Sequence, residues 1–227
     1  MRVLVPHALT AARIPLGAGA IIAAGDDRLV LAATLITVCA VSDGLDGWAA
    51  RVLRVSSPFG ALFDYFCDYL CFVIAPWMLT RMLLASDPSL IREAFLVLPL
   101  LTSALRYAQN GLTVSSREDE IRVLPGLGTV FFAFLSVTAV FLDARRSVDG
   151  QQFAWMMTAI VVLFSLLMVA PIEYPKLTAY RGASPVVLVL LACMPFVATR
   201  FLAAVMLVTG LLYAVAAPLL LRKRIST

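Results

Sequence analysis

Long apolar runs, many of them close to the length of a membrane span, follow one another along the chain. They predict helices over residues 11–24, 28–54, 58–84, 91–112, 126–142, 151–170, 185–199 and 201–221, after a short amphipathic segment at 3–10. Proline, glycine, serine and charged residues mark the breaks, as at Ser57-Pro58 and Asp87-Pro88. Because about 20 apolar residues in a helix cross the hydrocarbon layer of a bilayer, the pattern predicts an all-α fold, a polytopic transmembrane helical bundle.

Composition strengthens this interpretation. Hydrophobic residues make up 62% of the 227 residues and charged residues only 14%, and the mean hydropathy is +0.95. A soluble domain of this size has too little interior to bury so much apolar surface. The first apolar run continues into further apolar segments and does not end at a cleavage site, so we expect the N-terminus to belong to the mature protein. The whole of residues 1–227 is therefore expected to form one integral membrane domain.

The net charge of +4 does not indicate a nucleic-acid partner. The positive residues are scattered over the breaks between apolar runs and form no basic stripe with interleaved aromatics. With eight spans, more of the Arg and Lys residues fall at the N-terminus and in the even-numbered loops than on the other side. This asymmetry predicts a cytoplasmic N-terminus and a cytoplasmic turn around residues 54–58. We expect His7, in the amphipathic segment, to be an interfacial residue and not a ligand.

Cysteine usage points to packing. The four cysteines, Cys39, Cys67, Cys71 and Cys193, lie inside apolar stretches. Only Cys67 and Cys71 are close in sequence. No His or second Cys pair is placed to complete a four-ligand zinc site. We expect all four to be reduced side chains that fill space between helices.

Four aspartates stand out inside two apolar helices. Asp43 and Asp46 are three residues apart, and Asp64 and Asp68 are four apart, so each pair lies on one face of its helix. At about 1.5 Å per residue, the two pairs lie at overlapping depths when the chain turns back at residues 56–57. The sequence therefore predicts that the pairs face one another in a cavity that opens on the positively flanked side.

So much negative charge needs compensation. Four unpaired carboxylates at mid-membrane cost on the order of 10 kcal/mol or more. Arg51 and Arg106 are the cations that we count nearby, which leaves charge for one or two divalent ions. Oxygen ligands without His or Cys favour Mg²⁺ or Mn²⁺. Two other interpretations stay open: an internally paired structural network and the ion site of a cation-coupled transporter.

Small residues line the same helix faces. Gly47 follows Asp43 by four residues, Ala50 follows Asp46 by four, and Gly60 precedes Asp64 by four. Their small size leaves room for a bulky phosphate-bearing group. Next to them, the guanidinium of the arginine at position 51 is suited to phosphate oxygens.

These residues carry a resemblance to a known family. Residues 43–68 match every fixed position of the signature Asp-x-x-Asp-Gly-x-x-Ala-Arg-x8-Gly-x-x-x-Asp-x-x-x-Asp of CDP-alcohol phosphatidyltransferases. Leu9, Thr10 and Arg13 are similar to the Leu-Thr-x-x-Arg of the family's N-terminus. The resemblance implies a six-helix core over about residues 1–170, two further helices at about 185–221, and a homodimer.

The resemblance also implies a reaction in phospholipid biosynthesis, in which a phosphatidyl group moves from CDP-diacylglycerol to a small alcohol and CMP is released. It implies two ions of Mg²⁺ or Mn²⁺, with Asp68 as the base that takes the proton of the acceptor hydroxyl. The implied metal ligands are Asp43, Asp46, Asp64 and Asp68. The implied contacts to the CDP-lipid are Asp43, Gly47, Ala50, Arg51 and Gly60.

The acceptor alcohol is indicated by residues outside the signature. Residues 59–64, 72–76 and 104–110, with Leu124-Pro125 and Tyr174-Pro175, resemble bacterial and archaeal membrane-type phosphatidylserine synthases, which favours serine. Choline, glycerol 3-phosphate and inositol or its phosphate remain alternatives. The residues expected to bind the acceptor or a phosphate are Arg106, Asn110 and Arg122. The expected location is the cell (inner) membrane, with the active site open to the cytoplasm.

Overall fold

The computed structural model describes residues 4–53, 57–85, 89–114, 123–142 and 150–175. Helices account for most of them: α1 (Leu4–Gly25), α2 (Leu29–Leu53), α3 (Pro58–Tyr69), the π-helical turn η1 (Leu70–Ile74), α4 (Ala75–Leu83), α5 (Leu90–Leu96), α6 (Leu98–Val114), α7 (Val130–Phe141) and α9 (Gly150–Val169). Two short strands, β1 (Val123–Pro125) and β2 (Glu173–Pro175), complete the described elements. The predicted helical fold is confirmed, and the predicted helices at 185–199 and 201–221 lie outside the described residues.

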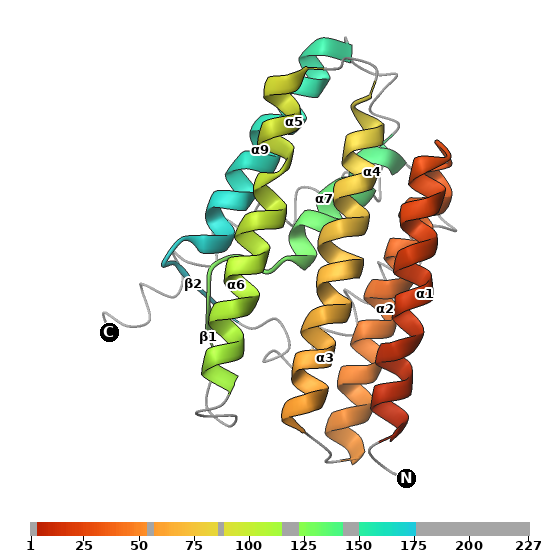
Figure 1. Cartoon of the computed structure of the whole chain (residues 1–227), viewed down its shortest axis with the longest axis vertical. Helices are drawn as coiled ribbons and strands as arrows, with labels where there is room; N and C mark the ends of the chain where they lie inside the picture. Colours follow the sequence, from red (N-terminus) through yellow and green to blue (C-terminus); the bar gives the residue numbers. More distant parts are fainter. Residues whose placement is uncertain (1–3, 54–56, 86–88, 115–122, 143–149, 176–227) are drawn as a thin grey trace.

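The helices form an up-and-down bundle (Figure 1). Helix α1 packs against α2 and α4, α7 packs against α2 and α4, and α6 packs against α9. In the view of Figure 1, α7 passes between the α1–α4 side of the molecule and the α5, α6 and α9 side. The described core lies mainly among α1, α2, α4 and α7, where most of the fully buried apolar side chains gather.

Small side chains bring α1 and α2 together. Ala20 and Ala24 of α1 and Ala32 and Ala33 of α2 are fully buried. Alanine at such positions lets two helix backbones approach closely, which increases the packing contacts available in an apolar medium. The close pairing of α1 with α2 holds α1 beside the helix that carries Asp43.

Helix α1 begins earlier than the sequence predicted. The segment 3–10 was expected to be a separate amphipathic piece, but the helix runs continuously from Leu4. Pro6 lies in the first turn, where the backbone N–H that proline lacks has no partner within the helix. Proline therefore does not prevent the early start.

A π-helical turn interrupts the predicted helix over 58–84. Helices α3 and α4 are continuous through η1, in which the N–H of Ala75 donates to the carbonyl of Leu70. Pro76 follows directly and has no N–H to continue the α-helical ladder. Turns of this type occur often at functional sites, and this one begins two residues after Asp68.

Pro99 explains another departure. A single helix was predicted over 91–112, whereas α5 ends at Leu96 and α6 begins at Leu98. Proline near a helix start is favoured, because its fixed φ suits the helix and its missing N–H has no role there. The proline thus marks a new helix start inside an apolar run.

The chain before α7 forms a tight turn, so α7 begins at Val130 and not near residue 126 as predicted. Gly126 has a φ of +74°, and its N–H donates to the carbonyl of Ile172 at 2.8 Å. The turn follows β1, which pairs antiparallel with β2 with Leu124 opposite Tyr174. This short pairing, which the hydrophobic pattern did not predict, joins the end of α9 to the start of α7.

Two described helical stretches are long and apolar enough to cross a membrane. They are Phe59–Leu83, with 25 residues, and Gln151–Val169, with 19. Shorter apolar helices cover Thr10–Gly25, Leu29–Leu45 and Val130–Phe141. Of the eight spans predicted, these two therefore have the length and composition of a membrane span within the described part of the chain.

A buried hydrogen bond links α4 to α7. Thr80 Oγ1 donates to Ser136 Oγ at 2.8 Å, and both side chains are fully buried. Thr80→Val keeps the shape and removes the donor, so we expect a loss of about 1 kcal/mol in the free energy of unfolding. Thermal unfolding in detergent measures it.

Thr138→Val on α7 is the matched control. Among the described residues, Thr138 Oγ1 has no hydrogen-bond partner although it is buried. Its replacement is expected to leave stability unchanged or to raise it slightly. Equal losses for the two variants would show that the contact between Thr80 and Ser136 does not stabilise the bundle.

Candidate active site

Helix α3 begins where the sequence places it. The side chain of Ser57 caps the helix by accepting a hydrogen bond from the N–H of Gly60 at 3.0 Å, and Pro58 occupies the first helical position, which favours proline. This start fixes the rotation of α3. As a result, Asp64 and Asp68, four residues apart, lie on the face that looks toward α2.

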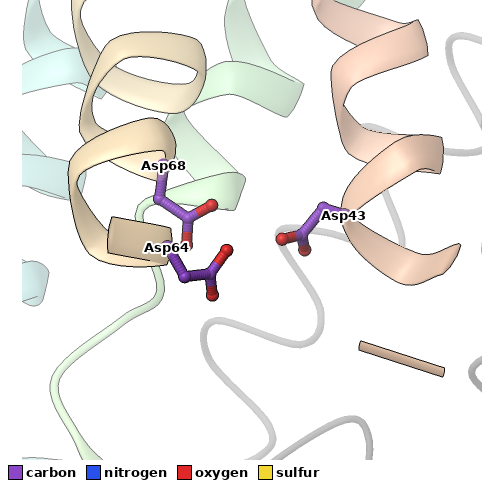
Figure 2. Close-up of side chains that lie close together, drawn as sticks. All are labelled: Asp43, Asp64 and Asp68. Atoms are coloured by element: carbon purple, nitrogen blue, oxygen red, sulfur yellow. The ribbon is translucent and has the colours of Figure 1, made fainter. Parts of the chain in front are cut away.

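Three of the four predicted aspartates meet between two helices. Figure 2 shows Asp64 and Asp68 of α3 pointing toward Asp43 of α2. One carboxylate oxygen from each lies within 4.8 Å of the others. The side chains of Asp43 and Asp64 are 34% and 38% exposed, and that of Asp68 is 17% exposed. The three residues, called the acidic cluster below, are close enough for one cation to contact all of them.

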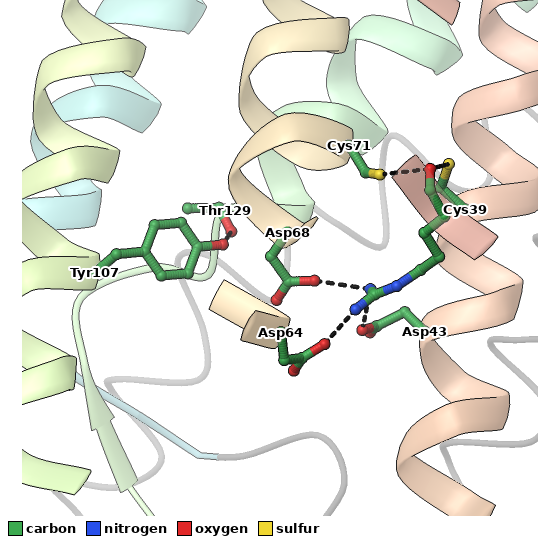
Figure 3. Close-up of polar contacts among 8 residues, drawn as sticks. Cys39, Asp43, Asp64, Asp68, Cys71, Tyr107 and Thr129 are labelled. Carbon is green, nitrogen blue, oxygen red and sulfur yellow. Dashed lines mark hydrogen bonds and ion pairs between the residues drawn. The ribbon is translucent and has the colours of Figure 1, made fainter. Parts of the chain in front are cut away.

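Arg13 of α1 contacts all three carboxylates. Its Nη1 donates to Asp43 Oδ1 at 2.6 Å and to Asp68 Oδ1 at 2.8 Å, and its Nη2 pairs with Asp64 Oδ1. The dashed lines in Figure 3 mark these contacts. The Arg13 side chain is completely buried. Three carboxylates and one guanidinium leave an excess of negative charge at the acidic cluster.

Arg13 was not among the cations expected from the sequence to compensate this charge, which were Arg51 and Arg106. The side chain of Arg51 lies outside the described residues, and Arg106 donates to the carbonyl of Met168 at 3.5 Å. The signal for Arg13 was present, since an arginine within an apolar helix needs an acidic partner. What the sequence lacked was the packing of α1 beside α2 and α3.

Two thiols converge on the backbone of Arg13. Cys71 Sγ and Cys39 Sγ lie 3.4 and 3.9 Å from its carbonyl oxygen, and Figure 3 draws both cysteines beside the acidic cluster. Cys39, Cys67 and Cys71 are buried and free, so the expectation of reduced packing residues is confirmed for these three. Cys193 lies outside the described residues.

Tyrosines border the acidic cluster on the side of α6. The hydroxyls of Tyr107 and Thr129 share a hydrogen bond of 2.7 Å, and Figure 3 shows Tyr107 reaching from α6 toward the neighbourhood of Asp68. The Tyr107 ring lies 5.4 Å from that of Tyr65 and 6.1 Å from that of Tyr69. Tyr107 was not singled out from the sequence, because nothing in the local pattern relates α6 to α3.

Gly60 lies against His7. A Cβ built at Gly60 would come within 2.5 Å of His7 Cε1 and 3.0 Å of Ser57 Oγ. The His7 ring also meets Phe59 edge to face, with centroids 5.9 Å apart. His7 was expected to be an interfacial residue; the structure places it half-buried against the start of α3.

Several predicted site residues are described only by their backbone or not at all. Asp46, Gly47, Ala50 and Arg51 belong to α2 and Asn110 belongs to α6, but their side chains lie outside the described part of the chain. Arg122 lies wholly outside it. Arg106 is buried, near the turn at Gly126.

Fold and site together define a class of protein: an apolar helical bundle whose polar chemistry centres on carboxylates from neighbouring helices. Comparison with known proteins makes the assignment specific. The family model for CDP-alcohol phosphatidyltransferases matches residues 3–169. The chain belongs to the CDP-alcohol phosphatidyltransferase family, and it is a CDP-alcohol phosphatidyltransferase enzyme. The transporter alternative is therefore set aside.

Two relatives come from Helicobacter pylori. Both are named CDP-diacylglycerol–serine O-phosphatidyltransferase, one from strain J99 and one from strain 26695. They are 28% and 27% identical to this chain over 208 residues, which is 92% of this chain and 87% of each relative. The resemblance found in the sequence, to the family and to its serine-specific branch, is thus confirmed at the level of similarity.

Proposed function

We propose that this enzyme transfers the phosphatidyl group of CDP-diacylglycerol to the hydroxyl of serine, releasing CMP and forming phosphatidylserine. The observation that carries the proposal is the acidic cluster, in which Asp43, Asp64 and Asp68 come together within the stretch that the family model matches. Similarity to serine-specific relatives over most of the chain supports serine as the acceptor. The product is a phospholipid, so the reaction belongs to lipid biosynthesis.

The acidic cluster fits a divalent metal. Its donors are carboxylate oxygens close enough to share an ion, they carry excess negative charge beside Arg13, and oxygen ligands suit Mg²⁺ or Mn²⁺. Asp43, Asp64 and Asp68, with Asp46, would hold one or, as we propose, two such ions. A bound divalent ion supplies Lewis-acid stabilisation of the charge that develops on phosphate oxygens.

Asp68 is the proposed general base. It is the least exposed member of the acidic cluster, so its carboxylate has little contact with bulk water. In the proposed reaction this carboxylate takes the proton of the serine hydroxyl as that oxygen bonds to the lipid-side phosphorus. The bond from this phosphorus to the bridging oxygen breaks, and CMP leaves with the bonding electrons. No covalent enzyme intermediate is needed.

The donor lipid is proposed to bind along the small residues of the signature. Gly47, Ala50 and Gly60 leave room for the pyrophosphate, Arg51 contacts its oxygens, and Asp43 completes the set. Of these, Asp43 and Gly60 have described surroundings. Gly60 lies one helical turn before Asp64, at the start of α3.

Gly60→Ala tests this placement. The added Cβ meets the end of the His7 side chain, which can turn aside, so we expect a loss of less than about 1 kcal/mol in unfolding free energy. Because the added methyl group occupies part of the proposed donor site, it should nevertheless lower kcat/KM for CDP-diacylglycerol about tenfold or more. Thermal unfolding and initial rates measure the two effects.

His7→Ala in the Gly60→Ala background is the control. It is expected to restore stability but not the rate. Recovery of the rate would indicate that His7, and not the lipid, needs the space.

The acceptor site is proposed to include Arg106, Asn110 and Arg122, with Tyr65 and Tyr107 nearby. Arg106 is buried on α6, the helix that carries Tyr107 toward Asp68. A fixed guanidinium is suited to a carboxylate such as that of serine. Choline lacks that carboxylate and inositol lacks any charge, so neither would gain from this contact.

An acceptor panel tests the proposal. Purified protein in detergent is given CDP-diacylglycerol, Mg²⁺ or Mn²⁺ and one of serine, glycerol 3-phosphate, inositol, inositol phosphate or choline, and CMP release is measured. We expect release with serine to exceed release with every other acceptor, and phosphatidylserine to be the lipid product. CMP release with another alcohol and not with serine would leave the family reaction in place and overturn the acceptor.

We further propose that the chain spans the cell (inner) membrane several times, as a homodimer with a cytoplasmic N-terminus and an active site open to the cytoplasm. Support comes from Phe59–Leu83 and Gln151–Val169, which meet the length and composition of a span. Large apolar side chains are exposed on both stretches: Phe59, Leu62, Phe66, Trp155, Leu163 and Leu166. In a bilayer these side chains would contact lipid or a second copy of the chain.

A further inference from the structure

Arg13 approaches the acidic cluster from the protein interior. Its side chain has no exposed surface, whereas those of Asp43 and Asp64 are about one-third exposed. Its contacts with Asp43, Asp64 and Asp68 all use the Oδ1 atom of the carboxylate. The guanidinium therefore forms the inner wall of the site, and the carboxylates lie between it and the open side.

A guanidinium in this place affects any other cation that binds the same carboxylates. It lowers the negative charge that attracts the ion, it engages oxygens that would serve as ligands, and it repels the ion directly. Because arginine stays protonated at all physiological pH values, the guanidinium cannot relieve this competition by losing a proton. The conflict is built into the site.

The backbone of Arg13 is also held in position. The thiols of Cys71 and Cys39 approach its carbonyl oxygen from η1 and α2, and Gly17, one turn later on α1, allows Cys71 to approach closely: a Cβ there would lie 2.9 Å from Cys71 Sγ. Close packing of α1 against both helices leaves the Arg13 side chain directed at the acidic cluster. The helix packing therefore places the backbone of Arg13 beside the acidic cluster.

We propose that Arg13 is an internal counter-ion that competes with the divalent metal for Asp43, Asp64 and Asp68. It stabilises the acidic cluster when no metal is bound, and it weakens metal binding so that the ions remain exchangeable. The inference rests on the metal site of the proposed function. In this role Arg13 acts on the metal through the three carboxylates and does not touch the substrate. Its measurable consequences are the affinity for the metal and the dependence of stability on the metal.

Direct metal binding tests the inference. The free Mn²⁺ signal in electron paramagnetic resonance gives the affinity of the full-length protein in detergent, and thermal unfolding with a chelator or with Mn²⁺ gives its stability. Arg13→Gln is expected to bind Mn²⁺ at least about tenfold more tightly than wild type. Its Tm should be lower in chelator, and Mn²⁺ should raise that Tm by more than it raises the wild-type Tm.

Arg13→Lys guards against a failure of Arg13→Gln to fold. Lysine keeps the charge as a single mobile ammonium that cannot hold several carboxylates as a rigid fork, so Mn²⁺ affinity should rise by a smaller factor. Arg92→Gln is the matched control. Arg92 is equally buried but donates to the carbonyl of Leu84 at 3.1 Å, so its loss should lower Tm without changing Mn²⁺ affinity.

The outcomes separate the inference from the function on which it rests. Mn²⁺ binding that Arg13→Gln or Arg13→Lys leaves unchanged or weakens overturns the competing role of Arg13 and leaves the metal site in place. An absence of Mn²⁺ binding in wild type and both variants overturns the metal site and the inference together. Failure of serine to act as acceptor changes neither result.

Discussion

Asp68→Asn is expected to lower the rate of CMP release about a thousandfold, the scale of losing a positioned general base. Asparagine has nearly the same shape as aspartate but cannot take the acceptor's proton. Asp68 also contacts Arg13 at 2.8 Å, so the substitution removes one of the charges that hold the guanidinium. Initial rates at saturating CDP-diacylglycerol and serine measure the effect on kcat.

The control is an aspartate of the same chain outside the acidic cluster. Asp26 is exposed in the turn between α1 and α2, and Asp26→Asn is expected to keep the wild-type rate. Unfolding curves for both variants show whether each remains folded. A folded Asp68→Asn protein that retains more than about a tenth of the wild-type kcat would exclude Asp68 as the base.

Gly126→Ala is expected to cost about 3 kcal/mol of unfolding free energy, combining a left-handed backbone with an overpacked site. Gly126 has a φ of +74°. An added Cβ would overlap the carbonyl oxygen of Met168, lie 2.8 Å from its carbonyl carbon and lie 2.9 Å from Arg106 Nη1. Because the nearest atoms belong to backbone, relief requires the end of α9 to move.

Gly128→Ala provides the comparison for this turn. Its Cβ would have ordinary contacts, the nearest being Phe131 Cδ2 at 3.7 Å, so we expect a change within about 0.5 kcal/mol. Thermal unfolding in detergent measures both variants. Similar stabilities would mean that the close approach of the turn to Met168 is not needed for the native packing.

The sequence predicted best where local chemistry decides the structure. Ser57 and Pro58 specify the start of α3, and the spacing of Asp64 and Asp68 then places both on one face. The facing arrangement with Asp43 followed from helix geometry together with the expected turn at residues 56–57. Three of the four aspartates lie together as this predicted, and the side chain of Asp46 lies outside the described residues.

The sequence predicted less well where contacts come from distant segments. Arg13 reaches Asp68 across 55 positions of sequence, and only the packing of α1 on α3 reveals it. The pairing of Leu124 with Tyr174 depends likewise on the segment before α7 meeting the segment after α9. Pro99 was a local signal for a new helix start. The apolar run continues on both sides of it, so the hydrophobic pattern alone predicted a single helix.

The most direct test of the account is the metal dependence of the transfer itself. Purified protein is treated with a chelator, given CDP-diacylglycerol and serine, and followed for CMP and phosphatidylserine while Mg²⁺ or Mn²⁺ is restored, with Asp64→Asn in parallel. We predict no product in chelator, recovery of both products in equal amounts as the ion is restored, and at most a small recovery for Asp64→Asn. Undiminished transfer in chelator, or full activity of Asp64→Asn, would contradict catalysis by divalent metal at the acidic cluster.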